Sequence, residues 1–215
     1  MSELRPDWIT VLRDCLLPVP EHRPEFWRTG ISDQPLDSAM RAYLGDTPTP
    51  AAVLVPVIDR GADSSLLFTR RSAELRHHAG QISFPGGKLD AADADPVAAA
   101  LRETREEIGV HAGFVQLLGF LPDHVVLTGF RITPVVALLT PGYTLQLAHS
   151  EVDSVFEVPL GFALHPDNYR QVTRNLRGFE IHAWDLPYGE DLIWGATAGM
   201  LRSLSQRFSG GGANG

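Results

Sequence analysis

Short apolar runs broken by turn residues dominate the chain from about residue 49 and predict β-strands. The runs "AAVLVPVI" (51–58) and "SSLLFTR" (64–70) flank the polar stretch "DRGADS", which is typical of a hairpin. We expect a further short strand in "GQISFPGG" (80–87), ending in a glycine-rich loop. Strand-like patterns recur at 115–123, 125–139, 152–160 and 179–186, with Gly129 at a turn and Pro134 at a sheet edge or strand end.

Other segments of the chain space their apolar residues as helices do. Segments 7–17 and 36–44 predict two short helices, and a last helix is expected within 193–208. Residues 95–109 also predict a helix, because Asp95 can cap its start, Pro96 suits the first position and Gly109 suits its end. The order favours one α+β domain at 47–208 with helices on both sides of a mixed sheet. We expect an N-terminal helical extension at 1–46 and a flexible tail at 209–215.

Composition narrows the class of protein. The 215 residues are 44% hydrophobic and 20% charged, as in ordinary globular proteins. No apolar run approaches the roughly 18 residues of a membrane span, and the N-terminus lacks a signal pattern, so we expect a cytoplasmic protein without a membrane partner. Cys15 is the single cysteine, so an internal disulfide is excluded and a buried core thiol is expected. A net charge of −8 argues against a nucleic-acid partner, and an anionic substrate would need a cation.

Three glutamates gather on one side of the helix predicted at 95–109. At about 100° per residue, Glu103, Glu106 and Glu107 share an arc of about 100°. The expected core face is another arc, made of Val97, Leu101, Thr104 and Ile108. A solvated face is the ordinary interpretation of such a run, but like charges at these spacings each destabilise a helix by about 0.2–0.5 kcal/mol. Mutually repelling carboxylates are what a hard divalent cation requires, so we predict a metal site. The pair Gly86-Gly87 just before the helix would let backbone groups approach a ligand or metal.

These residues resemble the Nudix box, which reads Gly, five residues, Glu, seven residues, then Arg-Glu-apolar-x-Glu-Glu-x-Gly-apolar. Gly87 begins the match, and "RETREEIGV" (102–110) supplies its second half. Two positions depart from the pattern, because Asp93 takes the first acidic place one residue too far from Arg102, and Thr104 takes an apolar place.

A second motif resembles the coenzyme A pyrophosphatase branch of Nudix hydrolases. That branch reads Leu-Leu-Thr-x-Arg-(Ser/Ala), three residues, Arg, three residues, Gly, three residues, Phe-Pro-Gly-Gly. "LFTRRSAELRHHAGQISFPGG" (67–87) matches it with Arg71, Ser72, Arg76, Gly80 and 84–87 in place, and only Phe68 departs. The branch also tolerates the longer gap before Arg102. Segments 151–160 and 193–201 look like later parts of the same branch.

The resemblance implies a Nudix α/β/α sandwich that hydrolyses coenzyme A, or a derivative, to 3′,5′-adenosine bisphosphate and 4′-phosphopantetheine with Mg²⁺ or Mn²⁺. It implies that Glu103, Glu106 and Glu107 hold metal, with the Gly87 carbonyl as a further ligand, and that Arg102 orients them. The general base is either Glu106 or Glu151. Arg71 and Arg76 are candidates for contacts with substrate phosphates, with structural salt bridges as the alternative.

Other functions stay open at this point. ADP-ribose, NADH or a nucleoside triphosphate would use the same chemistry, and a sensor that binds a nucleotide without cleaving it is a third possibility. Trp184 and Trp194 are expected in the core, although either could line a nucleotide or pantetheine pocket. A homodimer is common in the family.

Overall fold

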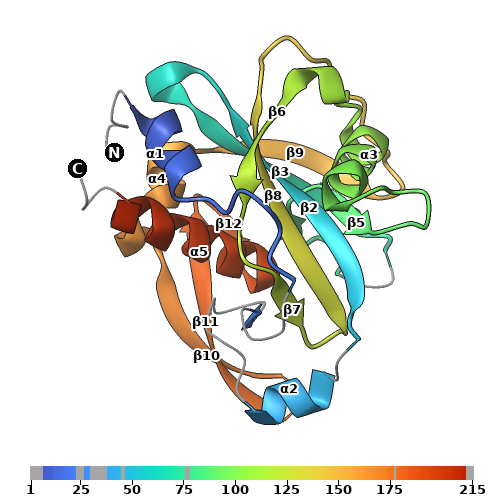
Figure 1. Ribbon diagram of the computed structural model, residues 1–215, viewed down its shortest axis with the longest axis vertical. Helices are drawn as coiled ribbons and strands as arrows, with labels where there is room; N and C mark the ends of the chain where they lie inside the picture. Colours follow the sequence, from blue (N-terminus) through green and yellow to red (C-terminus); the bar gives the residue numbers. More distant parts are fainter. Residues whose placement is uncertain are drawn as a thin grey trace.

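The computed structural model describes residues 7–22, 27–29, 38–44, 47–75, 78–176 and 178–211 (Figure 1). Its helices are α1 (Trp8–Asp14), α2 (Ser38–Leu44), α3 (Pro96–Ile108), α4 (Leu160–Leu164) and α5 (Gly195–Gly211). Its strands are β1 (Arg28–Thr29), β2 (Thr49–Ile58), β3 (Ser65–Arg71), β4 (Ile82–Ser83), β5 (Gly86–Lys88), β6 (Val115–Phe120), β7 (His124–Val126), β8 (Phe130–Leu139), β9 (Val152–Pro159), β10 (Arg170–Leu176), β11 (Phe179–Tyr188) and β12 (Asp191–Ile193). Short 3₁₀ turns lie at Gly61–Asp63, Ala112–Phe114 and Pro166–Asn168.

The main sheet is mixed. Its principal path runs β1-β7-β8-β2-β3-β4, with β5 paired to β2, β6 to β8 and β9 to β3. Strands β2 and β8 run parallel along their full length, whereas β2 and β3 form the predicted antiparallel hairpin. Strands β10, β11 and β12 form a separate antiparallel sheet.

Alternate residues of β2 feed two apolar cores. Ala52 and Leu54 belong to the core that contains Ile108 of α3, while Val55 and Val57 belong to the core formed with α1, α4 and α5. Figure 1 shows α3 on one side of the main sheet and α1, α4 and α5 on the other. Burial on both faces explains why β2 reads as a continuous apolar run. The predicted α+β sandwich with a mixed sheet is confirmed.

Pro134 corrects one expectation. It lies inside β8, opposite Val53 of β2, and not at an edge or strand end. Its carbonyl accepts a hydrogen bond from the Leu121 amide (3.1 Å), on the side where β6 has ended and β7 has not begun. Because a residue's N and C=O point to the same side of a strand, the missing N–H falls at this break and costs no bond to β2.

Several elements, among them the two-residue strand β1, and one boundary differ from the sequence-based expectation. Strand β10 was not predicted because "RQVTRNL" carries little apolar signal, and it pairs with β11 from Arg170–Asp185 to Leu176–Phe179. The five-residue helix α4 was also not predicted. Helix α5 continues to Gly211, three residues into the segment 209–215 expected to be a tail.

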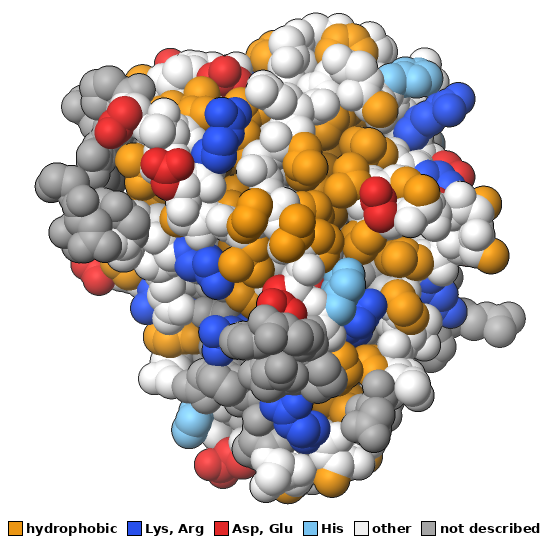
Figure 2. All heavy atoms as spheres, viewed as in Figure 1, with side chains coloured by type: hydrophobic (Ala, Val, Ile, Leu, Met, Phe, Trp, Pro, Cys, Tyr) orange, Lys and Arg blue, Asp and Glu red, His pale blue; other side chains and the backbone are white. Residues whose placement is uncertain are grey.

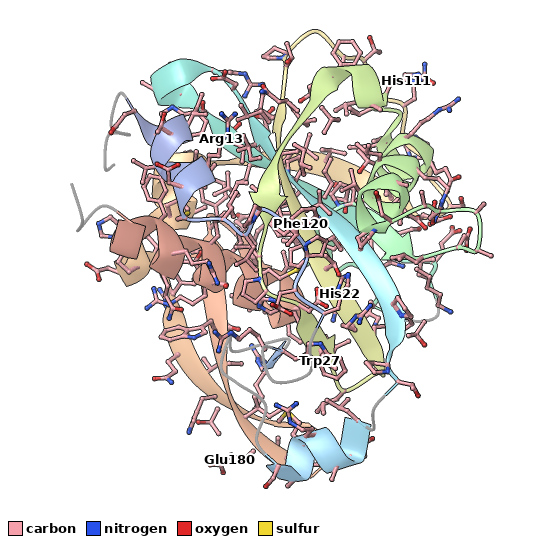
Figure 3. All side chains as sticks on the ribbon, in the orientation of Figure 1. Arg13, His22, Trp27, His111, Phe120 and Glu180 are labelled. Atoms are coloured by element: carbon pink, nitrogen blue, oxygen red, sulfur yellow. The ribbon has the colours of Figure 1, made fainter. Side chains whose placement is uncertain are left out.

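The N-terminal segment packs onto the main body. Trp8 and Leu12 of α1 are buried in the same core as α5. Further along, the buried Asp123 accepts a hydrogen bond from His22 Nδ1 (2.8 Å), and Trp27 Nε1 donates to the His22 carbonyl (2.9 Å). Figure 3 shows His22 and Trp27 close together beside β7. Cys15 is half-buried, and its Sγ donates a hydrogen bond to the Leu12 carbonyl. Burial raises the pKa of this thiol to about 11.

The surface carries apolar side chains on one face. Figure 2 shows hydrophobic side chains gathered over the middle of this face, where Figure 1 places β6. Exposed Leu117 belongs to β6, and exposed Val19 follows α1. Among the residues that the structure describes, no helix is long and apolar enough to cross a membrane.

Candidate active site

Helix α3 forms as its sequence predicts. The Asp95 side chain accepts a hydrogen bond from the Ala98 amide (2.8 Å), Pro96 occupies the first turn, and Gly109 ends the helix in the left-handed conformation (φ 77°). The predicted core face is partly wrong. Thr104 and Ile108 are buried, but Val97 and Leu101 are only half-buried because the helix is rotated toward Ala99, Ala100 and Glu107.

Arg102 is held from several sides. Its Nε and one terminal nitrogen donate to the two carboxylate oxygens of Asp93 (3.1 and 3.0 Å), and the same terminal nitrogen donates to the Lys88 carbonyl (3.0 Å). The other terminal nitrogen donates to Glu103 Oε1 (2.9 Å) and Glu106 Oε2 (3.0 Å). The hydrogen bond from Arg102 lowers the pKa of Asp93 below its usual range. Asp93 therefore fixes the guanidinium that orients two of the glutamates, despite the longer spacing between them.

Glu107 is buried beside the glycine pair. Only 4% of its surface is exposed, and its Oε2 accepts one long hydrogen bond from the Gly86 amide (3.3 Å). Burial raises the pKa of Glu107 to about 8; the charge of Arg71 opposes this shift, whereas the charges of Glu103 and Glu151 add to it. Burial likewise raises the pKa of Glu103, against the hydrogen bond from Arg102. At both carboxyls the effect of burial thus outweighs that of the neighbouring arginine.

The glycine pair forms part of strand β5 rather than a plain turn. Gly86 pairs with Val53 of β2 and has φ 156°, and a Cβ on it would lie 2.6 Å from Val53 Cα. A Cβ on Gly87 would lie 2.5 Å from Glu103 Cδ. At 86 the backbone of β2 leaves no room for a Cβ, whereas at 87 a Cβ would displace the Glu103 carboxylate.

The donor chemistry fits a hard divalent cation. Carboxylates that repel each other, one of them buried with a single weak donor, gain from a cation placed among them. Among the described residues, no group of three or more His, Cys, Asp or Glu side chains is arranged so that it could hold a metal ion without further ligands or movement. An open arrangement suits Mg²⁺, which keeps several waters and uses few protein ligands.

Glu151 is brought to the same side of the molecule by the loop that follows β8. The amides of Gln146 and Ala148 donate to the carbonyls of Ile108 and Glu107 at the end of α3 (3.0 and 2.9 Å). The Glu151 carbonyl accepts a hydrogen bond from the Ser72 amide (2.8 Å), just after β3. Its exposed side chain is near enough for its charge to act on Glu103 and Glu107. The other candidate base, Glu106, is 60% exposed and paired with Arg102.

Arg71 and Arg76 were the two arginines predicted to contact substrate phosphates, and the structure describes only the first of them. Arg71 ends β3, lies close enough to Glu107 to lower its pKa, and has a buried Nε with no hydrogen-bond partner among the described residues. Arg76 lies outside the described residues. Arg70, next to Arg71, pairs instead with Asp191 (2.5 Å).

A cavity of about 500 Å³ adjoins the carboxylates. Gly86, Gly87 and Arg71 line it where it meets them, and Trp194 lines it from the start of α5. Trp184 is outside this lining and packs under Arg202, 4.5 Å from the guanidinium carbon. Sequence reasoning missed most of the cavity wall, because its apolar residues carry the same signal as core residues.

Comparison with known proteins points to one protein family. The family model for the NUDIX domain matches residues 48–176, more than half of the chain. The chain is 44% identical over 155 residues to a Citrobacter koseri protein named "Uncharacterized Nudix hydrolase NudL", covering 72% of this chain and 80% of the relative. The Escherichia coli K12 protein of the same name is 42% identical over the same shares.

Solved structures with similar coordinates share less sequence. A MutT protein from Methanosarcina mazei is 21% identical with a TM-score of 0.48, covering 77% of this chain and 96% of that one. A MutT/nudix family protein from Enterococcus faecalis is 18% identical with a TM-score of 0.49, covering 74% of this chain and 61% of that one.

Proposed function

Because the chain belongs to the Nudix hydrolase family and is therefore a hydrolase of pyrophosphate bonds, we propose that it cleaves the diphosphate of coenzyme A or its derivatives. The products would be 3′,5′-adenosine bisphosphate and 4′-phosphopantetheine. The observation that carries the proposal is the position of the segment 67–87, whose Arg71 and glycine pair lie between the carboxylates and the cavity.

Nudix hydrolases generally use divalent metal ions, and we propose Mg²⁺ or Mn²⁺ held by Glu103, Glu106 and Glu107, with the Gly87 carbonyl as a further ligand. A bound divalent cation would screen the diphosphate and lower the pKa of the attacking water. Arg102, fixed by Asp93, would keep Glu103 and Glu106 in place. Arg71, whose Nε has no hydrogen-bond partner among the described residues, would donate to a substrate phosphate oxygen, since a guanidinium suits phosphate in charge and geometry. Arg76 is proposed as a second phosphate ligand on the sequence motif alone.

Between the two candidate bases, we favour Glu151. The Glu106 carboxylate accepts a hydrogen bond from Arg102, so one of its oxygens is already engaged and less free to take a proton from water. Glu151 stands across from α3, where its charge acts on Glu103 and Glu107. Glu151→Gln should lower kcat far more than KM, whereas Glu106→Gln should alter the metal dependence.

The experiment is a direct assay of the purified protein with coenzyme A and Mg²⁺ or Mn²⁺, measuring release of 3′,5′-adenosine bisphosphate. Glu107→Gln removes a carboxylate from the cluster and should abolish release. Glu180→Gln is the matched control, because Glu180 is exposed on β11, far from α3 in Figure 3. The same assay is run with three other substrates: ADP-ribose, NADH and a form of coenzyme A without the 3′-phosphate. Cleavage of ADP-ribose or NADH without cleavage of coenzyme A would reject the proposed substrate while leaving the hydrolase intact.

The proposed location is the cytoplasm, and the proposed assembly is a homodimer, as the family resemblance implies. Sedimentation of the full chain would decide between monomer and dimer.

A further inference from the structure

One histidine at the mouth of the site has an unusual backbone conformation. His78 has φ 59°, and among the described residues it is the only one other than glycine with a positive φ. Its side chain is exposed and lines the cavity together with Arg71 and the glycine pair. Strained residues of this kind persist only where their surroundings fix them, and they cluster at ligand-binding and catalytic sites. The backbone of His78 therefore directs attention to its side chain.

Backbone hydrogen bonds fix the turn that carries His78. The Gln81 amide donates to the His78 carbonyl (3.2 Å), and the Gly80 amide donates to the Arg71 carbonyl (3.1 Å). The Arg71 amide donates in turn to the Gln81 carbonyl (2.9 Å). The turn 78–81 is thus bound to the backbone of the residue proposed as a phosphate ligand, and the side chains of His78 and Arg71 border the same cavity.

A side-chain hydrogen bond orients the imidazole. His78 Nδ1 lies 2.7 Å from Gln81 Oε1. An amide oxygen can only accept, so the proton of this bond is on Nδ1, and Nε2 is the ring atom left for a ligand. When Nε2 is also protonated, the ring is a cation whose second N–H can donate to an anion.

The place of this ring suits a diphosphate. A diphosphate held at the carboxylates by a cation still presents charged oxygens on its other side, and these need donors. Arg71, His78 and Lys88 are the side chains of the cavity wall that can carry positive charge. The motif at 67–87 assigns no role to His78 or Gln81, because both stand at positions that it leaves open.

From this geometry we propose that His78 donates from Nε2 to an oxygen of the substrate diphosphate and that Gln81 positions the ring for this contact. The inference rests on the proposed function only for the place of the diphosphate. The contact is made to phosphate oxygens, so it serves coenzyme A, ADP-ribose or NADH alike. His78 is a binding residue, and Gln81 acts through it.

The test uses the full-length protein with Mg²⁺ and His78→Gly. Glycine adopts φ 59° without strain, so Tm should stay at or above the wild-type value. Loss of a hydrogen bond to a charged group should raise KM for coenzyme A by about tenfold with kcat retained. Imidazole added to the buffer should restore part of the loss. A wild-type KM, a lowered Tm or a loss that imidazole does not relieve would overturn the proposal.

Two further variants separate binding from structure. His111→Gly is the matched control, because His111 is exposed and outside the cavity lining, and it should keep the wild-type KM with or without imidazole. Gln81→Leu keeps the ring but removes its acceptor and should also raise KM. Combined with His78→Gly, it should raise KM no further, since it acts through the same ring. Additive effects would overturn the positioning role of Gln81.

A binding measurement separates this proposal from the proposed substrate. Imidodiphosphate, a diphosphate with a P–N–P bridge, is titrated calorimetrically into the protein with Mg²⁺, and His78→Gly should weaken its binding by about tenfold. Equal affinity in the two proteins would overturn the proposal even if coenzyme A is cleaved. Weakened binding in a protein that cleaves ADP-ribose but not coenzyme A would support the proposal and reject only the substrate.

Discussion

The glycine pair gives the sharpest test of the active-site geometry. In Gly87→Ala, the new Cβ would meet the Glu103 side chain 2.5 Å from Cδ, well inside ordinary contact. Restoring a contact of about 3.4 Å requires the carboxylate to move by about 1 Å, and a displacement of that size at a catalytic group can cost about 100-fold in rate. The carboxylate is the mobile end of a long side chain, and Gly87 is not among the glycines with positive φ. Its fold should therefore tolerate alanine.

Two other glycines provide matched comparisons. Gly113 has no atom within 4 Å of a built Cβ, so Gly113→Ala should keep both activity and stability. In Gly86→Ala the Cβ would meet backbone of Val53 at 2.6 Å, in a backbone conformation with φ 156°. Strain of about 1–3 kcal/mol is expected there, which lowers Tm by about 2–12 °C in a domain of this size.

The assay compares kcat/KM and Tm for the three variants under one set of conditions. We expect Gly87→Ala to lose about 100-fold in kcat/KM with a Tm close to wild type, and Gly86→Ala to lose Tm. The reasoning fails if Gly87→Ala retains full activity, because Glu103 would then have no need of its position against the glycine. It fails equally if Gly87→Ala unfolds like Gly86→Ala, since the lost activity would then report the fold.

Three further predictions concern single side chains. Asp93→Asn should lower kcat/KM by about tenfold, because an amide no longer fixes the guanidinium of Arg102 by charge, and a normal rate in this variant would deny Asp93 a positioning role. Burial lowers the pKa of His124 from 6.5 to about 4, so the unfolded chain binds the proton first, and stability should fall by about 3 kcal/mol between pH 6.5 and pH 4. Urea unfolding against pH should show a smaller loss in His124→Gln but not in the exposed-site control His182→Gln. Because burial raises the pKa of Cys15 to about 11, its thiolate at pH 8 should be about 100-fold scarcer than at the ordinary value of 9.0, and a disulfide reagent should label it quickly only in denaturant.

Local patterns in the sequence account for most of the fold. The helix at 96–108 follows from a capping aspartate, a first-turn proline and a terminal glycine, all of which act within a few residues. Strand β2 follows from its apolar run. Strand β10 does not, because its stability comes from pairing with β11 and from the ion pair of Arg174 with Asp185 (2.6 Å), which no local pattern records. Pro134 shows the same limit, since the position of a proline in a ladder depends on where the neighbouring strands end.

The candidate site was predictable where chemistry repeats at helical spacing. Helical spacing places three glutamates on one face of a helix: Glu103, Glu106 and Glu107. It does not predict that Glu107 is buried and Glu106 exposed. That difference arises because β5, bound to β2, covers the Glu107 side of the helix and leaves the Glu106 side open. Glu151 is joined to the cluster by the loop that caps α3, through contacts separated by about forty residues in sequence, and by the hydrogen bond from the Ser72 amide.

The main sheet affects the carboxylate cluster by burying Glu107. A buried carboxyl with one long hydrogen bond is unfavourable for folding, and in this site the neighbouring Glu103 and Glu151 increase the penalty. The same burial excludes water from one side of the cluster, so a cation among these carboxylates would interact with them in a medium less polar than water. Strand β5 creates this environment by packing two glycines against the helix, which brings the Gly86 amide to Glu107 and leaves room for Glu103. The glycine pair therefore contacts the carboxylates and also lines the cavity. This position links the motif at 67–87 to the glutamates at 103–107.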